Sequence, residues 1–376
     1  MSILTPKLDI LLFKFRIPSF HLFGIIGLIV GIICGLFVGK IIGLSAMIIL
    51  LMSFVSICCF ILLIILIKWA TGKESLVYYH HEILILIMNS VTLMLLKQPI
   101  LEFLDIALLG IAIFLAFGRI GCFSVGCCHG KPSNWGVKYG KPHVLKGFTS
   151  YYQDIKLFPI QLLESLFTFL ICIVGVIIIV SDLDAGTFLI IYSLFYGIFR
   201  FLIEFYRGDP DRPYWHDYSE AQWTTVALLL VIAFFVKFNL FPYYYWHLSL
   251  VGILILIFSL SLVYKKRNTL SSSLIKNPVH IREMASCFEK LSTSNVITNN
   301  NNIKIYKTKL GVRLSGDMNN HKVKHLTISN SNNKLIDVSV AIHIANIFKM
   351  FLKNEYSYDI IDSGSKCYQI IYSKIS

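Results

Sequence analysis

The stretch that decides the fold is LEFLDIALLGIAIFLAFGRIGCFSVGCCHG, residues 101–130. Its first part is an apolar run that ends at Arg119, and its second part holds three cysteines, a histidine and three glycines. A long apolar run is typical of a helix inside a membrane, where a charged side chain is costly unless it meets a partner. The stretch therefore predicts a membrane span followed by a polar, glycine-rich loop.

The rest of the chain has the composition of a membrane protein. Apolar residues make up 56% of it and charged residues 15%, whereas a soluble chain is about a quarter charged. Roughly 20 apolar residues cross a bilayer, and we place such runs at about 20–38, 44–67, 82–97, 101–117, 159–181, 185–206, 221–238 and 246–264. We predict an all-α polytopic membrane protein with seven or eight transmembrane helices. The first run is too long for a cleavable signal peptide, so we expect none.

Three parts follow one another along the chain. Residues 1–264 form the predicted membrane domain, with a loop or head at 118–158, and residues 265–302 predict an Asn-rich linker. Residues 303–376 contain two strand patterns, a helical pattern and a final hairpin pattern, which predict a small α+β accessory domain. Residues 265–376 contain 17 Lys and Arg but only 7 Asp and Glu. No nucleic-acid-binding motif accompanies this charge, so we expect a solvated domain near anionic lipid headgroups and no nucleic acid.

Ionisable residues at membrane depth mark the candidate site. Four stand out in or beside the apolar runs: Arg119, Glu164, Arg200 and Glu204. On a helix, Arg200 and Glu204 share one face, which Tyr196 and Arg207 extend. A structural ion pair explains an isolated Arg–Glu pair. The surplus of arginine favours an anion site instead, and phosphate fits the planar guanidinium. In a bilayer that phosphate belongs to a lipid headgroup, so the pattern favours a lipid-handling site.

The cysteine-rich loop allows three interpretations. A zinc site would use Cys122, Cys127, Cys128 and His129, although zinc ligands usually come as two separated pairs. A reactive thiol would need its pKa lowered by Arg119 or His129. The favoured interpretation is geometric: glycines let the backbone turn sharply and approach a ligand, and small cysteines pack around it. These glycines are Gly118, Gly121, Gly126 and Gly130. On this interpretation the chain requires no metal and no cofactor.

The motifs GRIGCFSVGCCHG, WGVKYG, FPIQLLES, YSLFYGIFRFLIEFYRGD and YSEAQWT, in this order, resemble the bacterial prolipoprotein diacylglyceryl transferases over about residues 17–240. The resemblance implies a multi-pass enzyme of the bacterial cytoplasmic (inner) membrane. Such an enzyme transfers the diacylglyceryl group of phosphatidylglycerol to the lipobox cysteine thiol of a prolipoprotein and releases glycerol phosphate. It would place the loop 118–158 outside the cytoplasm, although the lysines of that loop favour the inside.

The resemblance also implies roles for single residues. Arg119 and Arg200 would hold the phosphate, Glu204 and Tyr196 would orient the site, and His81 would act as the base that deprotonates the thiol. The expected substrate-binding residues are Gly118, Gly121, Cys122, Gly126, Cys127, Gln161, Glu164 and Arg207. The expected partners are phosphatidylglycerol, the prolipoprotein cysteine and membrane lipids.

Several positions depart from the family pattern. Members usually have Asn where Cys122 stands, Glu where Cys127 stands and Tyr where Phe23 stands, and likewise His and Tyr where Phe158 and Leu163 stand. These departures keep two alternatives open. One is a phospholipid-dependent transferase with a different acceptor, and the other is a non-catalytic lipid-binding membrane scaffold.

Overall fold

The computed structural model describes residues 6–12, 14–72, 76–181, 183–210, 212–216, 218–242, 244–267, 277–293, 305–330, 336, 338–364 and 367–375. Within the predicted linker, residues 268–276 and 294–302 lie outside the described residues, whereas Pro278–Thr293 form a helix, so the prediction of a linker is wrong for that stretch. The chain divides into two compact units. The first comprises residues 1–130, 159–207 and 218–258, and the second comprises residues 131–158, 208–217 and 259–376.

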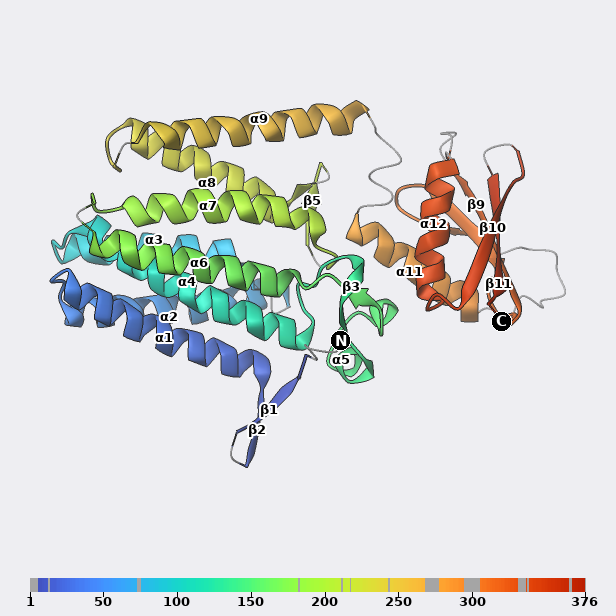
Figure 1. The fold of residues 1–376 in the computed structure, drawn as a ribbon, viewed down its shortest axis with the longest axis horizontal. Coiled ribbons are helices and arrows are strands. Elements are labelled where there is room, and N and C mark those ends of the chain that lie inside the picture. The colour runs from blue at the N-terminus through green and yellow to red at the C-terminus, as the bar shows by residue number, and fades with distance from the viewer. Residues whose placement is uncertain are drawn as a thin grey trace. The chain divides into compact units, whose positions relative to one another are not determined.

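The first unit is a bundle of long helices (Figure 1). They are α1 (Ser19–Ile41), α2 (Ala46–Thr71), α3 (Tyr78–Leu95), α4 (Ile100–Val125), α6 (Ile160–Val180), α7 (Thr187–Ile203), α8 (Glu220–Lys237) and α9 (Tyr245–Arg267). A 3-10 turn, η2 (Glu204–Tyr206), extends α7. A short hairpin, β1 (Asp9–Leu12) and β2 (Phe15–Pro18), precedes α1.

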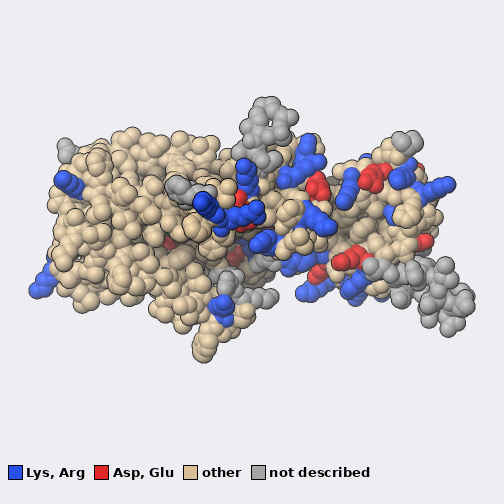
Figure 2. Space-filling model, turned by 90° about the horizontal axis from the view of Figure 1, so that it is seen from below, with Lys and Arg blue, Asp and Glu red and all other residues tan. Residues whose placement is uncertain are grey.

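Six helices in the described part of the chain are long and apolar enough to cross a membrane, namely α1, α2, α4, α6, α7 with η2, and α8. The chain is thus a mostly helical, multi-pass membrane protein, but the predicted seven or eight spans are not confirmed. Helix α3 begins with the polar sequence YYHHE, and His247–Val263 of α9 form a shorter apolar helix among the residues whose side chains are described. Figure 2 shows that most of the length of this unit carries almost no charged side chain on the face in view, as contact with lipid requires.

Helix α4 is the centre of the bundle, since α1 and α6 pack along it side by side (Figure 1). The helices α1 and α4 approach closely where Gly31 faces Gly110: a Cβ on Gly31 would lie 2.9 Å from the Gly110 carbonyl oxygen. Small residues allow such close approach in membranes, where van der Waals packing drives helix association. The glycine pair therefore sets the distance between these two helices.

Buried polar contacts fix the two helices that face α4. The Asp105 carboxylate of α4 accepts hydrogen bonds from the backbone N–H groups of Gly186 and Leu189, each at 2.8 Å, at the start of α7. A carboxylate there satisfies free N–H groups and complements the helix dipole. The Ser165 hydroxyl of α6 donates to the Ala116 carbonyl of α4 at 2.8 Å. These contacts fix the heights at which α6 and α7 pass α4.

The second unit contains the predicted C-terminal strand-rich domain. Its antiparallel sheet has the order β10-β11-β9-β8-β7. The strands are β7 (Tyr306–Lys307), β8 (Val312–Asp317), β9 (Val323–Asn330), β10 (Tyr356–Asp362) and β11 (Cys367–Lys374), and α11 (Pro278–Thr293) and α12 (Val338–Phe351) accompany them. The predicted strands, helix and hairpin are confirmed. The remaining short elements are β3 (Pro132–Lys138), α5 (Lys141–Leu145), η1 (Ser150–Tyr152), β4 (Lys156–Leu157), β5 (Tyr214–Trp215) and β6 (Tyr218–Ser219).

The glycine contact between α1 and α4 gives a first prediction. Gly31→Ala places a methyl group against a backbone carbonyl and should lower the stability of the protein by about 1–3 kcal/mol. Gly24→Ala, on the same helix, meets no atom within 4 Å and should not destabilise it. Thermal unfolding in detergent, followed by gel filtration of the remaining folded protein, measures both. Equal melting temperatures for the two variants would contradict this packing.

Candidate functional site

Six buried polar side chains from three helices meet in the first unit. None is more than 6% exposed. They are Arg119 of α4, Glu164 of α6, Tyr196 and Arg200 of α7, and Glu204 and Arg207 at the end of α7 and η2. We call this set the arginine–glutamate cluster. All six were predicted site residues, and the structure brings them together.

Glu164 is the hub of the cluster. One carboxylate oxygen, Oε2, lies 3.0 Å from Nε of Arg119. The other, Oε1, accepts a hydrogen bond from the Tyr196 hydroxyl at 2.9 Å and lies 3.7 Å from Nε of Arg200. A carboxylate can accept several such bonds at once. A single residue of α6 thereby joins α4 to α7.

A second carboxylate organises the end of α7. Oε2 of Glu204 lies 2.6 Å from Nη1 of Arg200, as the spacing of four residues predicts. It also lies 4.0 Å from Nε of Arg207. The backbone N–H of Arg207 donates to the Glu204 carbonyl at 3.2 Å, and a β-bridge pairs Arg207 with Gly130. The turn after α7 is thus tied to the end of the cysteine-rich loop.

Three guanidinium groups, those of Arg119, Arg200 and Arg207, gather in the cluster around the carboxylates of Glu164 and Glu204. A buried charge is retained where it is paired or where it binds a ligand of opposite charge. Guanidinium groups suit phosphate because their N–H donors match its oxygens. The cluster is therefore a chemically suitable site for one anionic phosphate group.

Gly118 and Gly121, which were expected in the loop, lie within α4, so the loop begins after Val125 and not at residue 118. Gly126 ends α4 with a φ of +83°, in the left-handed region that glycine adopts without strain. Gly121 lies under α1, since a Cβ there would sit 3.2 Å from the Cα of Phe20. A Cβ on Gly118 would meet no atom within 4 Å. The expected sharp turn thus depends on Gly126. The backbone at Gly121 does make a close approach, but to helix α1 and not to a ligand.

Gln161 holds the loop against α6. Its Nε2 donates to the Cys127 carbonyl at 2.8 Å, and the side chain is 1% exposed. The three loop thiols lie together, with their Sγ atoms all within 4.8 Å of one another. The pKa of the Cys128 thiol lies well below its ordinary value, because hydrogen bonds from the thiols of Cys122 and Cys127 and the nearby arginines outweigh the effect of burial. The loop brings these thiols closer together than the sequence alone indicates.

Two adjacent histidines at the start of α3 have different surroundings. His81 is 3% exposed, its Nδ1 is 3.0 Å from the Val77 carbonyl oxygen, and its ring packs on Phe60. The Nε2 of His80 lies 2.8 Å from a carboxylate oxygen of Glu220 at the start of α8, and both side chains are partly exposed. Sequence reasoning missed this His–Glu pair. Its only signal is the doubled histidine in YYHHE and the acidic residue in YSEAQWT.

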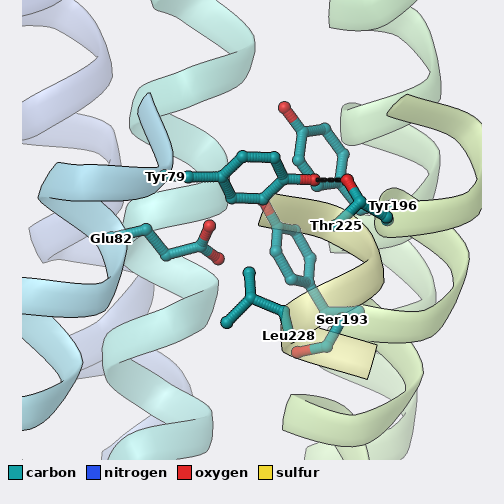
Figure 3. Close-up of a pocket in the computed structure, with 8 residues that line it drawn as sticks. Tyr79, Glu82, Ser193, Tyr196, Thr225 and Leu228 are labelled. Carbon is teal, nitrogen blue, oxygen red and sulfur yellow. Dashed lines mark hydrogen bonds between the residues drawn. The ribbon is translucent and has the colours of Figure 1, made fainter. Parts of the chain in front are cut away.

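A pocket adjoins the cluster. Its lining comes from α3, α7 and α8 and consists of Tyr79, Glu82, Tyr192, Ser193, Tyr196, Gly197, Thr225 and Leu228. Figure 3 shows the Glu82 carboxylate and the rings of Tyr79 and Tyr196 around this space, with the Tyr79 hydroxyl bonded to the Thr225 hydroxyl at 2.9 Å. Tyr196 belongs to both the pocket and the cluster, so the two form one continuous site.

The buried arginine–glutamate cluster lies among helices that are long and apolar enough to cross a membrane. The sequence model of the family described as prolipoprotein diacylglyceryl transferase matches residues 11–238, more than half of the chain. The chain therefore belongs to this family.

Two curated relatives agree with this assignment. A phosphatidylglycerol–prolipoprotein diacylglyceryl transferase of Clostridium tetani is 34% identical over 111 residues, which are 30% of this chain and 43% of the relative. A protein of Clostridium perfringens named phosphatidylglycerol–prolipoprotein diacylglyceryl transferase 2 is 30% identical over 116 residues, again 30% of this chain and 43% of the relative. The chain thus matches less than half the length of each relative.

The hub role of Glu164 gives a second prediction. Glu164→Gln leaves Arg119 and Arg200 buried without their shared carboxylate, which should destabilise the protein by about 3–5 kcal/mol. The matched control is Glu102→Gln, an exposed residue on α4, which should change stability by less than about 0.5 kcal/mol. Thermal unfolding of the purified proteins in detergent compares them. A Glu164→Gln variant as stable as the control would show that Glu164 is not the hub.

Proposed function

We propose that this protein transfers the diacylglyceryl group of phosphatidylglycerol to the cysteine thiol of a prolipoprotein lipobox and releases glycerol phosphate. The single observation that carries the proposal is the arginine–glutamate cluster, which gathers three buried guanidinium groups among apolar helices. A lipid phosphate is the anion that this location offers. Membership of the family and the names of the two relatives support the same donor and acceptor.

In this proposal the arginines act on the leaving group. Arg119 and Arg200 hold the phosphate of phosphatidylglycerol and stabilise the charge that grows on it as the bond to the glyceryl carbon breaks. Glu164 and Glu204 keep the guanidinium groups in place without cancelling all of their charge. Tyr196 donates to Glu164 and forms the wall between the cluster and the pocket. We propose that the donor lipid reaches the cluster past this wall.

A base is needed to take the proton of the incoming thiol. The expected residue, His81, is buried and its Nδ1 is directed to a backbone carbonyl oxygen. We therefore propose its neighbour His80 for this role, because its imidazole is accessible and a carboxylate, Glu220, orients it. A carboxylate partner fixes the tautomer and stabilises the imidazolium that forms when the proton is taken.

The remaining expectations complete the proposal. Gln161 supports the loop through the Cys127 carbonyl, and we propose that Gly118, Gly121, Cys122, Gly126, Cys127 and Arg207 line the path of the substrates. The six apolar helices suit the bacterial cytoplasmic membrane, which is the location that the proposed reaction requires. The C-terminal domain, residues 303–376, is proposed as an accessory to it.

The phosphate clamp gives a third prediction. Arg119→Lys keeps the charge but removes the planar set of donors, so kcat for transfer to a synthetic lipobox peptide should fall by about 10²–10³. The control is Arg16→Lys, an exposed arginine before α1, which should transfer at the rate of the unaltered protein. Full activity of Arg119→Lys in folded protein would remove Arg119 from the site.

The assignment of the base gives a fourth prediction. His80→Gln should lower kcat/KM by about 10²–10⁴, and Glu220→Gln should lower it by a smaller factor because the imidazole remains. His81→Gln serves as the comparison, with the same substitution one residue away. A loss confined to His81→Gln would return the role to His81, as first expected from the sequence.

A further inference from the structure

The three thiols of the cysteine-rich loop converge, and no step of the proposed transfer uses them. The Sγ atoms of Cys122, Cys127 and Cys128 lie within 4.8 Å of one another. Thiolates bound to a tetrahedral Zn²⁺ at 2.3 Å stand about 3.8 Å apart. The thiols therefore need to move by only about 1 Å to bind one ion, a distance that side-chain rotation covers.

The backbone of the loop produces this convergence. Cys122 lies on the last turn of α4, and Gly126 reverses the chain just after it. Cys128 has a φ of +55°, which is uncommon for a residue other than glycine. Gln161 holds the Cys127 carbonyl from α6. The loop is thus fixed from the neighbouring helix in a conformation that keeps its thiols on one side.

The electrostatic surroundings suit thiolates and a metal ion together. Arg119 lies on the same helix as Cys122, three residues before it, and Arg207 pairs with Gly130, two residues after Cys128. Three thiolates around one Zn²⁺ carry a net charge of −1, which these guanidinium groups complement. The carbonyl end of α4 also favours a cation. Charges of both signs are therefore balanced at this place.

A disulfide bond fits the arrangement less well. It joins two sulfur atoms at about 2.05 Å, which requires a far larger contraction than metal binding does, and it leaves one of the three thiols unused. Three convergent sulfur atoms instead supply three of the four ligands of a tetrahedral zinc site and leave one position for another ligand.

We propose that Cys122, Cys127 and Cys128 bind one Zn²⁺ and that its fourth position takes the thiol of the acceptor peptide. This inference rests on the proposed function, because it needs a thiol acceptor. On binding, the acceptor thiol gives up its proton to His80 and becomes a zinc-bound thiolate. Its sulfur lone pair then forms the S–C bond to the glyceryl carbon. The C–O bond to the phosphate breaks, its electron pair leaves with glycerol phosphate, and no atom is oxidised or reduced.

The test begins with the full chain purified under reducing conditions and titrated with Co²⁺ as a probe for Zn²⁺. We expect one equivalent of Co²⁺ to give a thiolate-to-cobalt charge-transfer band and the d–d bands of a tetrahedral site. Cys127→Ser and Cys128→Ser should lose most of the charge-transfer band. Cys58→Ser, which removes an exposed thiol of α2, should keep it. Gel filtration checks that each variant is folded.

The acceptor is tested on the same Co²⁺ form. A synthetic lipobox peptide with its cysteine should raise the charge-transfer intensity by roughly a third, as a fourth thiolate joins three. The same peptide with serine should leave it unchanged. A cobalt band that ignores the cysteine peptide would overturn the acceptor role.

Further outcomes separate this inference from the proposed function. Transfer activity without any cobalt band, or with a band that survives Cys128→Ser, would overturn the metal site and leave the transferase intact. A disulfide between two of the thiols would lower the mass of the chain by two hydrogens, and reductant would restore that mass. Such a disulfide, together with a reduced chain that takes up no metal, would also overturn the metal site. A cobalt band that responds to the peptide, in a protein that releases no glycerol phosphate, would support the metal site and count against the transferase.

Discussion

The Glu164 carboxylate, held between Arg119 and Arg200, is the interaction on which the site depends. It joins α4, α6 and α7 through side chains that are almost fully buried. Removing a partner from such a group costs far more than the net value of the pair. The three helices are consequently held at one relative height, and the positions of the arginines follow from it. Asp105 and Ser165 reinforce the same arrangement farther along α4.

The arrangement of charged residues that suits the proposed chemistry is not the one that would make the helix bundle most stable. A bundle built for stability alone would match each arginine with a carboxylate, whereas this one carries three arginines for two glutamates. Arg207 makes the third, and η2 brings it in by tightening the chain after α7. In the proposed function a lipid phosphate is a further partner of opposite charge for these guanidinium groups. The cluster lies among helices apolar enough to contact lipid.

The helical fold could be predicted from the sequence because its signal is local. Six of the predicted runs became helices long enough to span a membrane, and the face shared by Arg200 and Glu204 followed from the helical period. The count of spans could not be predicted, since the polar start of α3, YYHHE, makes this helix unlike the other apolar runs. The contact between His80 and Glu220 joins two helices that are far apart in the sequence, so no local pattern predicts it. The convergence of the three thiols depends on the conformation of a turn, which the local sequence does not predict either. The positive φ of Cys128 is an example, because nothing in the residues around it requires that conformation.

The central claim is that this site moves a diacylglyceryl group from a lipid phosphate to a peptide thiol. The most direct measurement incubates the purified protein with phosphatidylglycerol micelles and a synthetic lipobox peptide, then follows the mass of the peptide and the release of glycerol phosphate. The account predicts a diacylglyceryl increase in peptide mass with one glycerol phosphate released for each modified peptide. Folded protein that binds the lipid but neither modifies the peptide nor releases glycerol phosphate would contradict it.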